Sequence, residues 1–110
     1  MRRQLRAWLI ERDANEAEVS EILVAVSEAV NNAIQHAQRR QRERVDVEAF
    51  VVDDRVTVCV RDYGAWRSGS TRDEGGRGLA IMRDLMDAVE IDRMADGTSI
   101  KLQRHLTFPS

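Results

Sequence analysis

An acid, an amide and an imidazole recur at four-residue intervals in one stretch of this chain, at Glu28, Asn32 and His36. Side chains at positions i, i+4 and i+8 lie along one side of a helix, so these three groups can face one site together. Asparagine is a poor helix former, and Asn31-Asn32 lies among strong helix formers, which suggests that at least one amide has a function. A carboxylate and an amide oxygen one turn apart suit a hard cation such as Mg²⁺ beside phosphates.

A structural interpretation of the same row stays open. Glu28 is also explained as a solvated acid on a helix surface. His36 is also explained as a residue near the negative end of the helix dipole. The row alone therefore defines a candidate site without fixing its chemistry.

Three further short motifs follow along the chain. Asp62-Tyr63-Gly64 ends a predicted strand, where a carboxylate can accept a hydrogen bond from an exocyclic amine such as that of adenine; a plain turn explains it equally well. Gly75-Gly76-Arg77-Gly78 directly precedes a predicted helix, and backbone N–H groups, a helix dipole and the Arg77 cation together favour a phosphate; an ordinary glycine-rich loop before a helix explains it equally well. Gly97-Thr98 is either a hairpin turn or a small residue and a hydroxyl at a ligand.

The elements that position these motifs are predicted from hydrophobic periodicity. Helical spacing predicts helices over residues 2 to about 12 and from a cap at Asn15 to about residue 38, and Asn15 with Glu18 matches a capping box. Alternation of period two predicts strands over residues 45–51 and 55–61, paired antiparallel through a turn at Asp53-Asp54. A loop over 62–78, a helix of about ten residues, and strands over 89–94 and 98–104 complete the order.

This order predicts an α+β fold: a two-layer sandwich of a mostly antiparallel sheet with helices on one face. The length of 110 residues predicts a single domain over 1–110. The net charge of −2 gives no reason to expect nucleic-acid binding, and the apolar runs are too short to span a bilayer. The single cysteine, Cys59, is expected to be a buried structural thiol, and a cytoplasmic location fits best.

The four motifs in this order resemble the ATP-binding boxes of the GHKL ATPase superfamily. They read Glu28-x-x-x-Asn32-Ala33-x-x-His36-Ala37, Asp62-x-Gly64, Gly76-x-Gly78-Leu79 and Gly97-Thr98. Within that superfamily the chain looks most like the bacterial anti-sigma-factor serine kinases of partner-switching systems. The resemblance covers nearly the whole chain and implies the GHKL fold.

The resemblance implies a role for each matched residue. Glu28 would be the general base that takes a proton from a substrate serine, and Asn32 would coordinate Mg²⁺. Asp62 would hold the adenine amine of ATP, with Thr98 supporting that pocket. The remaining expected nucleotide-binding residues are His36, as a wall residue near the phosphates, Gly64, Gly76, Arg77, Gly78 and Leu79. The implied partners are a sigma factor, an anti-sigma-factor antagonist of the STAS type and a second copy in a homodimer.

Three departures from the family pattern matter. Trp66 stands where the family usually has a second glycine; it either packs over the nucleotide or covers the core. The segment between Gly64 and Gly76 is short for a lid over ATP. The family usually begins with a strand before the first helix, so we expect this chain to be a piece of a longer protein with an exposed sheet edge.

Two other functions remain as alternatives. A binding module would hold a partner and bind nucleotide weakly or not at all, which Trp66 and the short lid favour. The catalytic domain of a sensor histidine kinase is less favoured, because the sequence contains no dimerisation helix with a phosphoacceptor histidine and the lid is too short.

Overall fold

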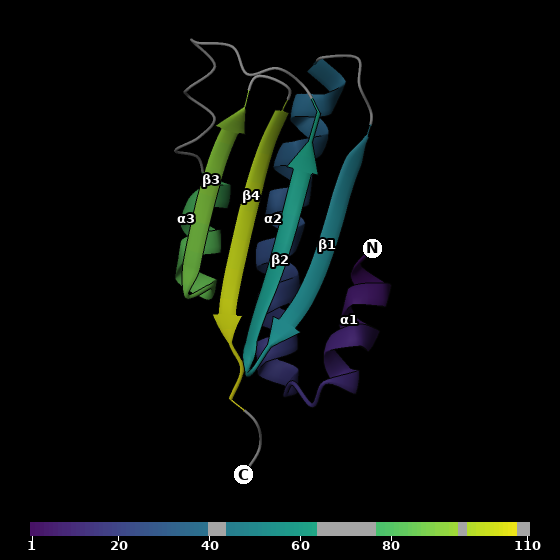
Figure 1. Ribbon diagram of the computed structural model, residues 1–110, viewed down its shortest axis with the longest axis vertical. Helices are drawn as coiled ribbons and strands as arrows, with labels where there is room; N and C mark the ends of the chain where they lie inside the picture. Colours follow the sequence, from purple (N-terminus) through teal and green to yellow (C-terminus); the bar gives the residue numbers. More distant parts are fainter. Residues whose placement is uncertain (40–43, 64–76, 95–96, 108–110) are drawn as a thin grey trace.

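The computed structural model describes residues 1–39, 44–63, 77–94 and 97–107. Its elements, in chain order, are α1 (Arg2–Glu11), α2 (Glu16–Arg39), β1 (Val45–Val52), β2 (Arg55–Asp62), α3 (Arg77–Leu85), β3 (Ala88–Met94) and β4 (Gly97–His105) (Figure 1). The predicted order of helices and strands is therefore confirmed.

The described strands form one four-stranded antiparallel sheet in the order β1-β2-β4-β3. The long helix α2 runs along one face of this sheet, and α3 packs beside it (Figure 1). This is the predicted α+β two-layer arrangement. Within the described residues, β1 and β3 are the two edge strands of the sheet.

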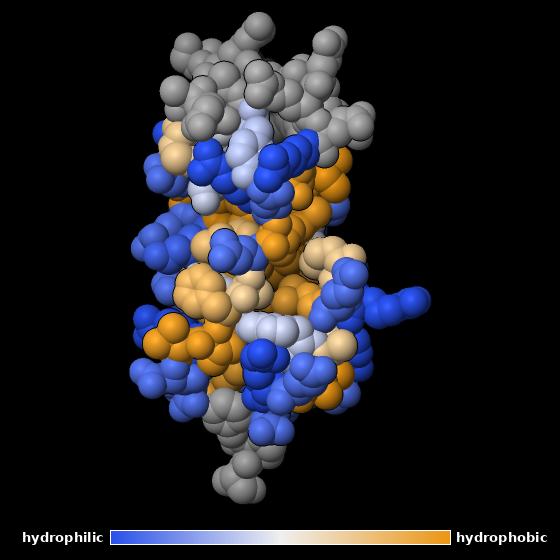
Figure 2. Space-filling view, turned by 45° about the vertical axis from the view of Figure 1, so that its right-hand side comes forward, coloured by the Kyte–Doolittle hydropathy of each residue, from blue (hydrophilic) through white to orange (hydrophobic). Residues whose placement is uncertain are grey.

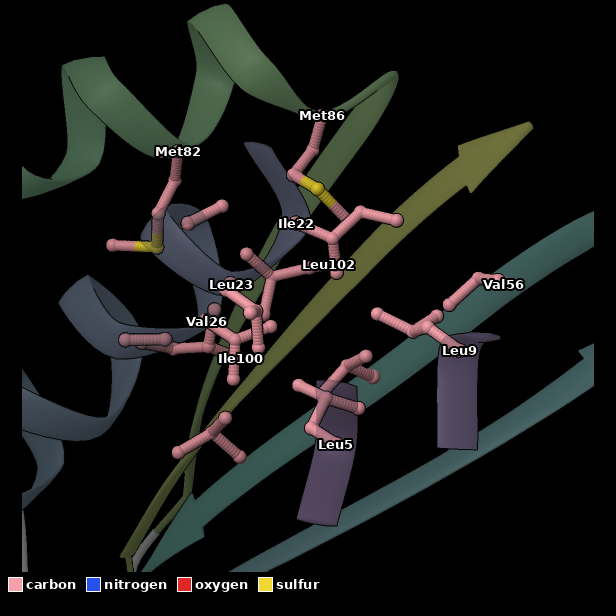
Figure 3. Packing of buried hydrophobic residues seen from close by; sticks show 14 of the residues in the cluster. Leu5, Leu9, Ile22, Leu23, Val26, Val56, Met82, Met86, Ile100 and Leu102 are labelled. Carbon is pink, nitrogen blue, oxygen red and sulfur yellow. The ribbon is translucent and has the colours of Figure 1, made fainter. Parts of the chain in front are cut away.

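The hydrophobic core lies between α2 and the inner face of the sheet. Alternate residues of β2 and β4 point into it, which is the period-two pattern that the sequence showed. Figure 3 shows core residues Ile22, Val26, Val56, Met82, Ile100 and Leu102. Val58 and Val60 of β2 belong to the same core. Burial of this face holds the long helix against the two central strands.

The start of α2 confirms half of the predicted capping box. Asn15 Oδ1 accepts a hydrogen bond from the Glu18 N–H at 2.8 Å. The Glu18 carboxylate does not return this bond: its Oε2 accepts bonds from Thr107 N at 2.7 Å and Thr107 Oγ1 at 2.9 Å. Glu18 is 4% exposed, and its bonds to Thr107 hold the segment after β4 against the start of α2.

Three residues predicted in loops or turns belong to regular elements. Asp62 is the last residue of β2, Gly78 is the second residue of α3, and Gly97 is the first residue of β4. Asp62 pairs with Val45 and Thr98, and these two neighbours extend the strand by one residue. Gly78 was predicted to end the loop before the helix, but it belongs to the first turn of α3, where glycine is tolerated because the N–H groups have no intrahelical partner.

The expectation of a buried Cys59 is wrong. The strict alternation of β2 turns Val58 and Val60 into the core, so Cys59 faces the opposite side of the sheet and is only half-buried. There it lies between Glu48 of β1 and Lys101 of β4 in the pairing register. Burial, and then the charge of Glu48, raise the pKa of its thiol.

An apolar groove of about 300 Å³ lies between α1 and the edge strand β1. Its lining consists of Met1, Gln4, Leu5, Trp8, Val47 and Ala49. The face of the molecule shown in Figure 2 carries several apolar patches separated by polar residues. Among the described residues, no helix is both long and apolar enough to span a lipid bilayer.

Candidate functional site

The first part of the candidate site is the contact between α2 and the N-terminal turn of α3. A Cβ atom added at Gly78 would lie 3.1 Å from Glu28 Oε2 and 3.4 Å from Asn32 Nδ2. The structure therefore brings together the two best residues of the helical row and one glycine of the glycine-rich motif. These residues are 46 positions apart at their closest in the sequence, so only the fold could establish this contact.

The helix start at this contact favours a negatively charged group. Arg77 is exposed at the first position of α3, and Leu79 packs partly buried against the core. Packing of Leu79 orients the first turn of α3, whose N–H groups and dipole favour an anion. Glu28 and Asn32 beside this turn supply oxygen atoms of the kind that Mg²⁺ prefers.

The second part of the candidate site lies where β2 ends and β4 begins. Asp62 is 3% exposed, and its Oδ1 accepts a hydrogen bond from the Thr98 N–H at 3.2 Å. Gly97 lies directly against the backbone of Asp62: a Cβ at Gly97 would be 2.1 Å from the Asp62 carbonyl oxygen. Only glycine fits there, so Gly97 lets β4 approach closely enough for Thr98 to orient the carboxylate.

Thr98 carries a polar atom that suggests a ligand in this part of the site. Thr98 is 4% exposed, and its Oγ1 is buried without a hydrogen-bond partner among the described residues. A buried polar atom without a partner is costly, and such groups need an explanation. A nucleotide base beside Asp62 would supply a partner, so the residues present fit an adenine nucleotide.

The end of β2, the start of β4 and the C-terminal end of α2 lie at the same end of the molecule, and α3 lies beside α2 nearer its middle (Figure 1). Gly64, Gly76 and Trp66 fall outside the described residues, as does the side chain of His36. Within the described ranges, no group of three or more His, Cys, Asp or Glu side chains gathers to hold a metal ion.

A polar cluster beside Asp62 was missed by the sequence reasoning. The Tyr63 hydroxyl donates a hydrogen bond to the Asp46 carboxylate, which also pairs with Arg44 at 3.2 Å. The guanidinium groups of Arg44 and Arg61 each lie 4.9 Å from the centre of the Tyr63 ring. The predicted hairpin could have indicated this cluster, because its register places Asp46 directly opposite Arg61.

The charges in this cluster reinforce one another. The hydrogen bond from Tyr63, followed by that from Arg44, lowers the pKa of the Asp46 carboxyl. The same hydrogen bond raises the pKa of the Tyr63 hydroxyl, and Asp46 raises the pKa of Arg44. Each shift favours the protonation states that hold the cluster together at neutral pH.

Comparison with known proteins gives consistent results. The sequence profile described as histidine kinase-like ATPase domain matches residues 1–104. The anti-sigma F factor of Clostridium beijerinckii is 28% identical over 118 residues, covering 94% of this chain and 82% of that protein. The serine-protein kinase RsbW of Bacillus subtilis is 31% identical over 106 residues, covering 81% of this chain and 66% of that protein.

A solved structure matches the fold over nearly the whole chain. It contains the RsbU and RsbW domains of a Mycobacterium tuberculosis protein and matches at a TM-score of 0.79 with 32% sequence identity. The match covers 99% of this chain and 29% of the solved chain. The region of similarity is thus one part of that larger protein.

Proposed function

The chain belongs to the histidine kinase-like ATPase domain family, and on that basis we propose that it is an ATP-dependent protein serine kinase and anti-sigma factor. Its substrate would be a serine of a small anti-sigma-factor antagonist of the STAS type, and it would also sequester a sigma factor in the cytoplasm. The names of its relatives, anti-sigma F factor and serine-protein kinase, support both halves of this proposal.

The residues of the site have distinct roles in this reaction. Asp62, oriented by Thr98, would accept a hydrogen bond from the adenine amine. Glu28 would take the proton from the substrate serine hydroxyl as its oxygen attacks the γ-phosphorus of ATP and the bond to the leaving ADP breaks. Asn32 would coordinate Mg²⁺ through its amide oxygen, and the ion would neutralise charge on the phosphates when bound.

The observation that carries the proposal is the contact of Gly78 with both Glu28 and Asn32. It places a carboxylate and an amide at the first turn of α3, where a phosphate would be favoured. Phosphoryl transfer is catalysed mainly by positioning and by charge neutralisation. A base and a metal-binding amide one helical turn apart on α2 can serve the attacking and bridging oxygens together.

The proposal is tested by two measurements on the wild-type chain. Isothermal titration with Mg-ATP should show binding, and labelled ATP should transfer phosphate to an antagonist domain encoded nearby. Absence of heat up to millimolar Mg-ATP would rule out the kinase. Binding of ATP without transfer to any antagonist would instead favour the alternative, a regulatory module that acts by holding a partner, which Trp66 at a usual glycine position favours.

A second copy of the chain is the third partner that we propose. Strand β1 lies at an edge of the sheet that the described residues form, next to an apolar groove. Phe50 and Val52 add exposed apolar side chains on the outer face of the same strand. Antiparallel pairing of β1 with its copy would cover these groups.

A further inference from the structure

The cluster around Tyr63 fastens the end of β2 to the start of β1. The last paired residues of these two strands are Asp62 and Val45, and Tyr63 lies one residue beyond. Strand ends open more readily than strand centres. The hydrogen bond from the Tyr63 hydroxyl to Asp46 reaches back across this end and adds a contact where the backbone ladder stops.

The cluster is braced from several directions. Arg44 binds the Asp46 carboxylate through Nε at 3.2 Å and through a terminal nitrogen at 3.3 Å. Arg61, directly before Asp62, lies over the Tyr63 ring and also reaches Met94 Sδ of β3 at 4.0 Å. Two-point binding between guanidinium and carboxylate fixes orientation as well as distance.

Asp62 is thus held on both sides. Toward β4, Gly97 and Thr98 fix its backbone and its Oδ1. Toward β1, its two sequence neighbours, Arg61 and Tyr63, belong to the cluster. A hydrogen bond weakens steeply when its distance and angle depart from the optimum, so a fixed carboxylate recognises an amine better than a mobile one.

We propose that Tyr63, Asp46 and Arg44 are positioning residues that hold the Asp62 carboxylate for recognition of the adenine amine. This inference rests on the proposed binding of ATP and adds a determinant of base specificity. The cluster lies on the face of the sheet opposite α2, so none of its members needs to touch the nucleotide. Its effect therefore differs between nucleotides with and without an exocyclic amine.

The test compares ATP with inosine triphosphate, which has a carbonyl oxygen in place of the adenine amine. In Tyr63→Phe the ring stays and the hydrogen bond to Asp46 is lost. We expect the Kd for ATP to rise about three- to tenfold, the effect of one weakened hydrogen bond, while the Kd for inosine triphosphate stays within about twofold of wild type. At saturating ATP, kcat should be unchanged and KM raised.

Thr57→Val is the matched control. Thr57 also lies on β2 and faces the same side, and its Oγ1 accepts a hydrogen bond from Gln103 Nε2 at 3.3 Å. Its removal should leave the Kd for both nucleotides unchanged. Asp46→Asn, which keeps an acceptor for Tyr63, should fall between Tyr63→Phe and wild type.

The outcomes separate this inference from the proposed function. If wild type binds ATP and Tyr63→Phe binds it equally well, or loses both nucleotides equally, Tyr63 does not act through Asp62. If wild type binds no ATP, the proposed function fails and this inference fails with it. A selective loss of ATP binding in a variant that is fully folded under the binding conditions, as its cooperative unfolding transition shows, supports the inference.

Discussion

Gly78 of α3 lies directly against Glu28 of α2. A methyl group at Gly78 would come within 3.1 Å of Glu28 Oε2, closer than side chains usually approach, and within 3.4 Å of the Asn32 amide nitrogen. The neighbour that must yield is the end of a flexible side chain. The absence of a side chain at this position therefore sets where the Glu28 carboxylate can lie.

This relationship predicts opposite effects of Gly78→Ala on stability and on activity. Alanine is the better helix former by about 1 kcal/mol, so the free energy of unfolding should stay equal or rise. The methyl group should displace the Glu28 carboxylate, and phosphotransfer should fall at least about tenfold, because misplacement by a fraction of an ångström costs rate. Urea unfolding and transfer from labelled ATP give the two numbers.

Ala80→Gly is the control for that variant. Ala80 is exposed on the same helix, so its replacement should cost about 1 kcal/mol of stability and leave phosphotransfer unchanged. Full activity in Gly78→Ala would show that the contact with Glu28 has no role in the reaction.

Glu28→Gln should separate nucleotide binding from phosphotransfer. The amide matches the carboxylate in size but cannot take a proton, so the rate of transfer should fall by about 10² to 10⁴ while the Kd for ATP stays near that of wild type. Glu16→Gln is the control, because Glu16 is exposed on the same helix, where it pairs with Arg6. Transfer at the wild-type rate in Glu28→Gln would show that another group is the base.

Gly97→Ala should damage both the fold and the nucleotide site. The added Cβ would lie 2.1 Å from the Asp62 carbonyl oxygen, and both atoms belong to paired strands that cannot move apart freely. Overpacking of this kind costs about 1–3 kcal/mol of unfolding free energy. The loss of ATP affinity should exceed the loss expected from partial unfolding, because the Thr98 N–H would move away from the Asp62 carboxylate. Ser99→Ala on the same strand is the control and should change neither the unfolding free energy nor the Kd for ATP.

Much of the fold was predictable because local patterns and packing agree. Alternation in Val56, Val58 and Val60 fixed both the strand and its inner face. The same alternation should have placed Cys59 outside, but an apolar run of residues was taken as buried on both sides. In a sheet with helices on one face, the residues that alternate with the core residues face the other side and stay half-exposed, and Cys59 is one of them.

The sequence named the residues of the candidate site but not their contacts. Glu28 and Asn32 were found from their spacing, and Asp62 and Thr98 from the order of motifs. The proximity of Gly78 to Glu28 depends on how α3 returns across α2, which no local pattern encodes. The Tyr63 cluster depends on the register of β1 with β2, which the short turn at Asp53-Asp54 determines.

The Asp46–Tyr63 hydrogen bond predicts a stability profile that falls at both extremes of pH. The pKa of Asp46 is lowered in the folded state, so its contribution is complete above the ordinary value of 3.8 and is lost as pH falls through the folded-state pKa. The pKa of Tyr63 is raised, so its contribution is complete below 10.0 and is lost as pH rises through the folded-state value. Urea unfolding across pH should show both losses.

Tyr63→Phe and Asp46→Asn serve as the comparison for that profile. Both variants should unfold with flatter pH dependence than wild type at the acidic end, since Tyr63→Phe removes the largest cause of the lowered Asp46 pKa and Asp46→Asn removes the titrating carboxyl. Only Tyr63→Phe removes the alkaline titration itself. An unchanged profile in both variants would mean that the hydrogen bond does not form in solution.

The charge pattern of the edge strand β1 predicts how substitutions at Phe50 change the association of two copies of the chain. Antiparallel pairing of two copies centred on Ala49 would place Glu48 opposite Phe50 of the second copy, with no acid facing an acid. Phe50 is 44% exposed on the outer face, so its replacement disturbs the monomer little. Phe50→Glu should abolish the dimer by placing like charges opposite each other, whereas Phe50→Lys should preserve or tighten it through pairing with Glu48.

Sedimentation or light scattering over a range of concentrations distinguishes the two variants. Equal behaviour of Phe50→Glu and Phe50→Lys, or a monomeric wild type, would contradict pairing through β1.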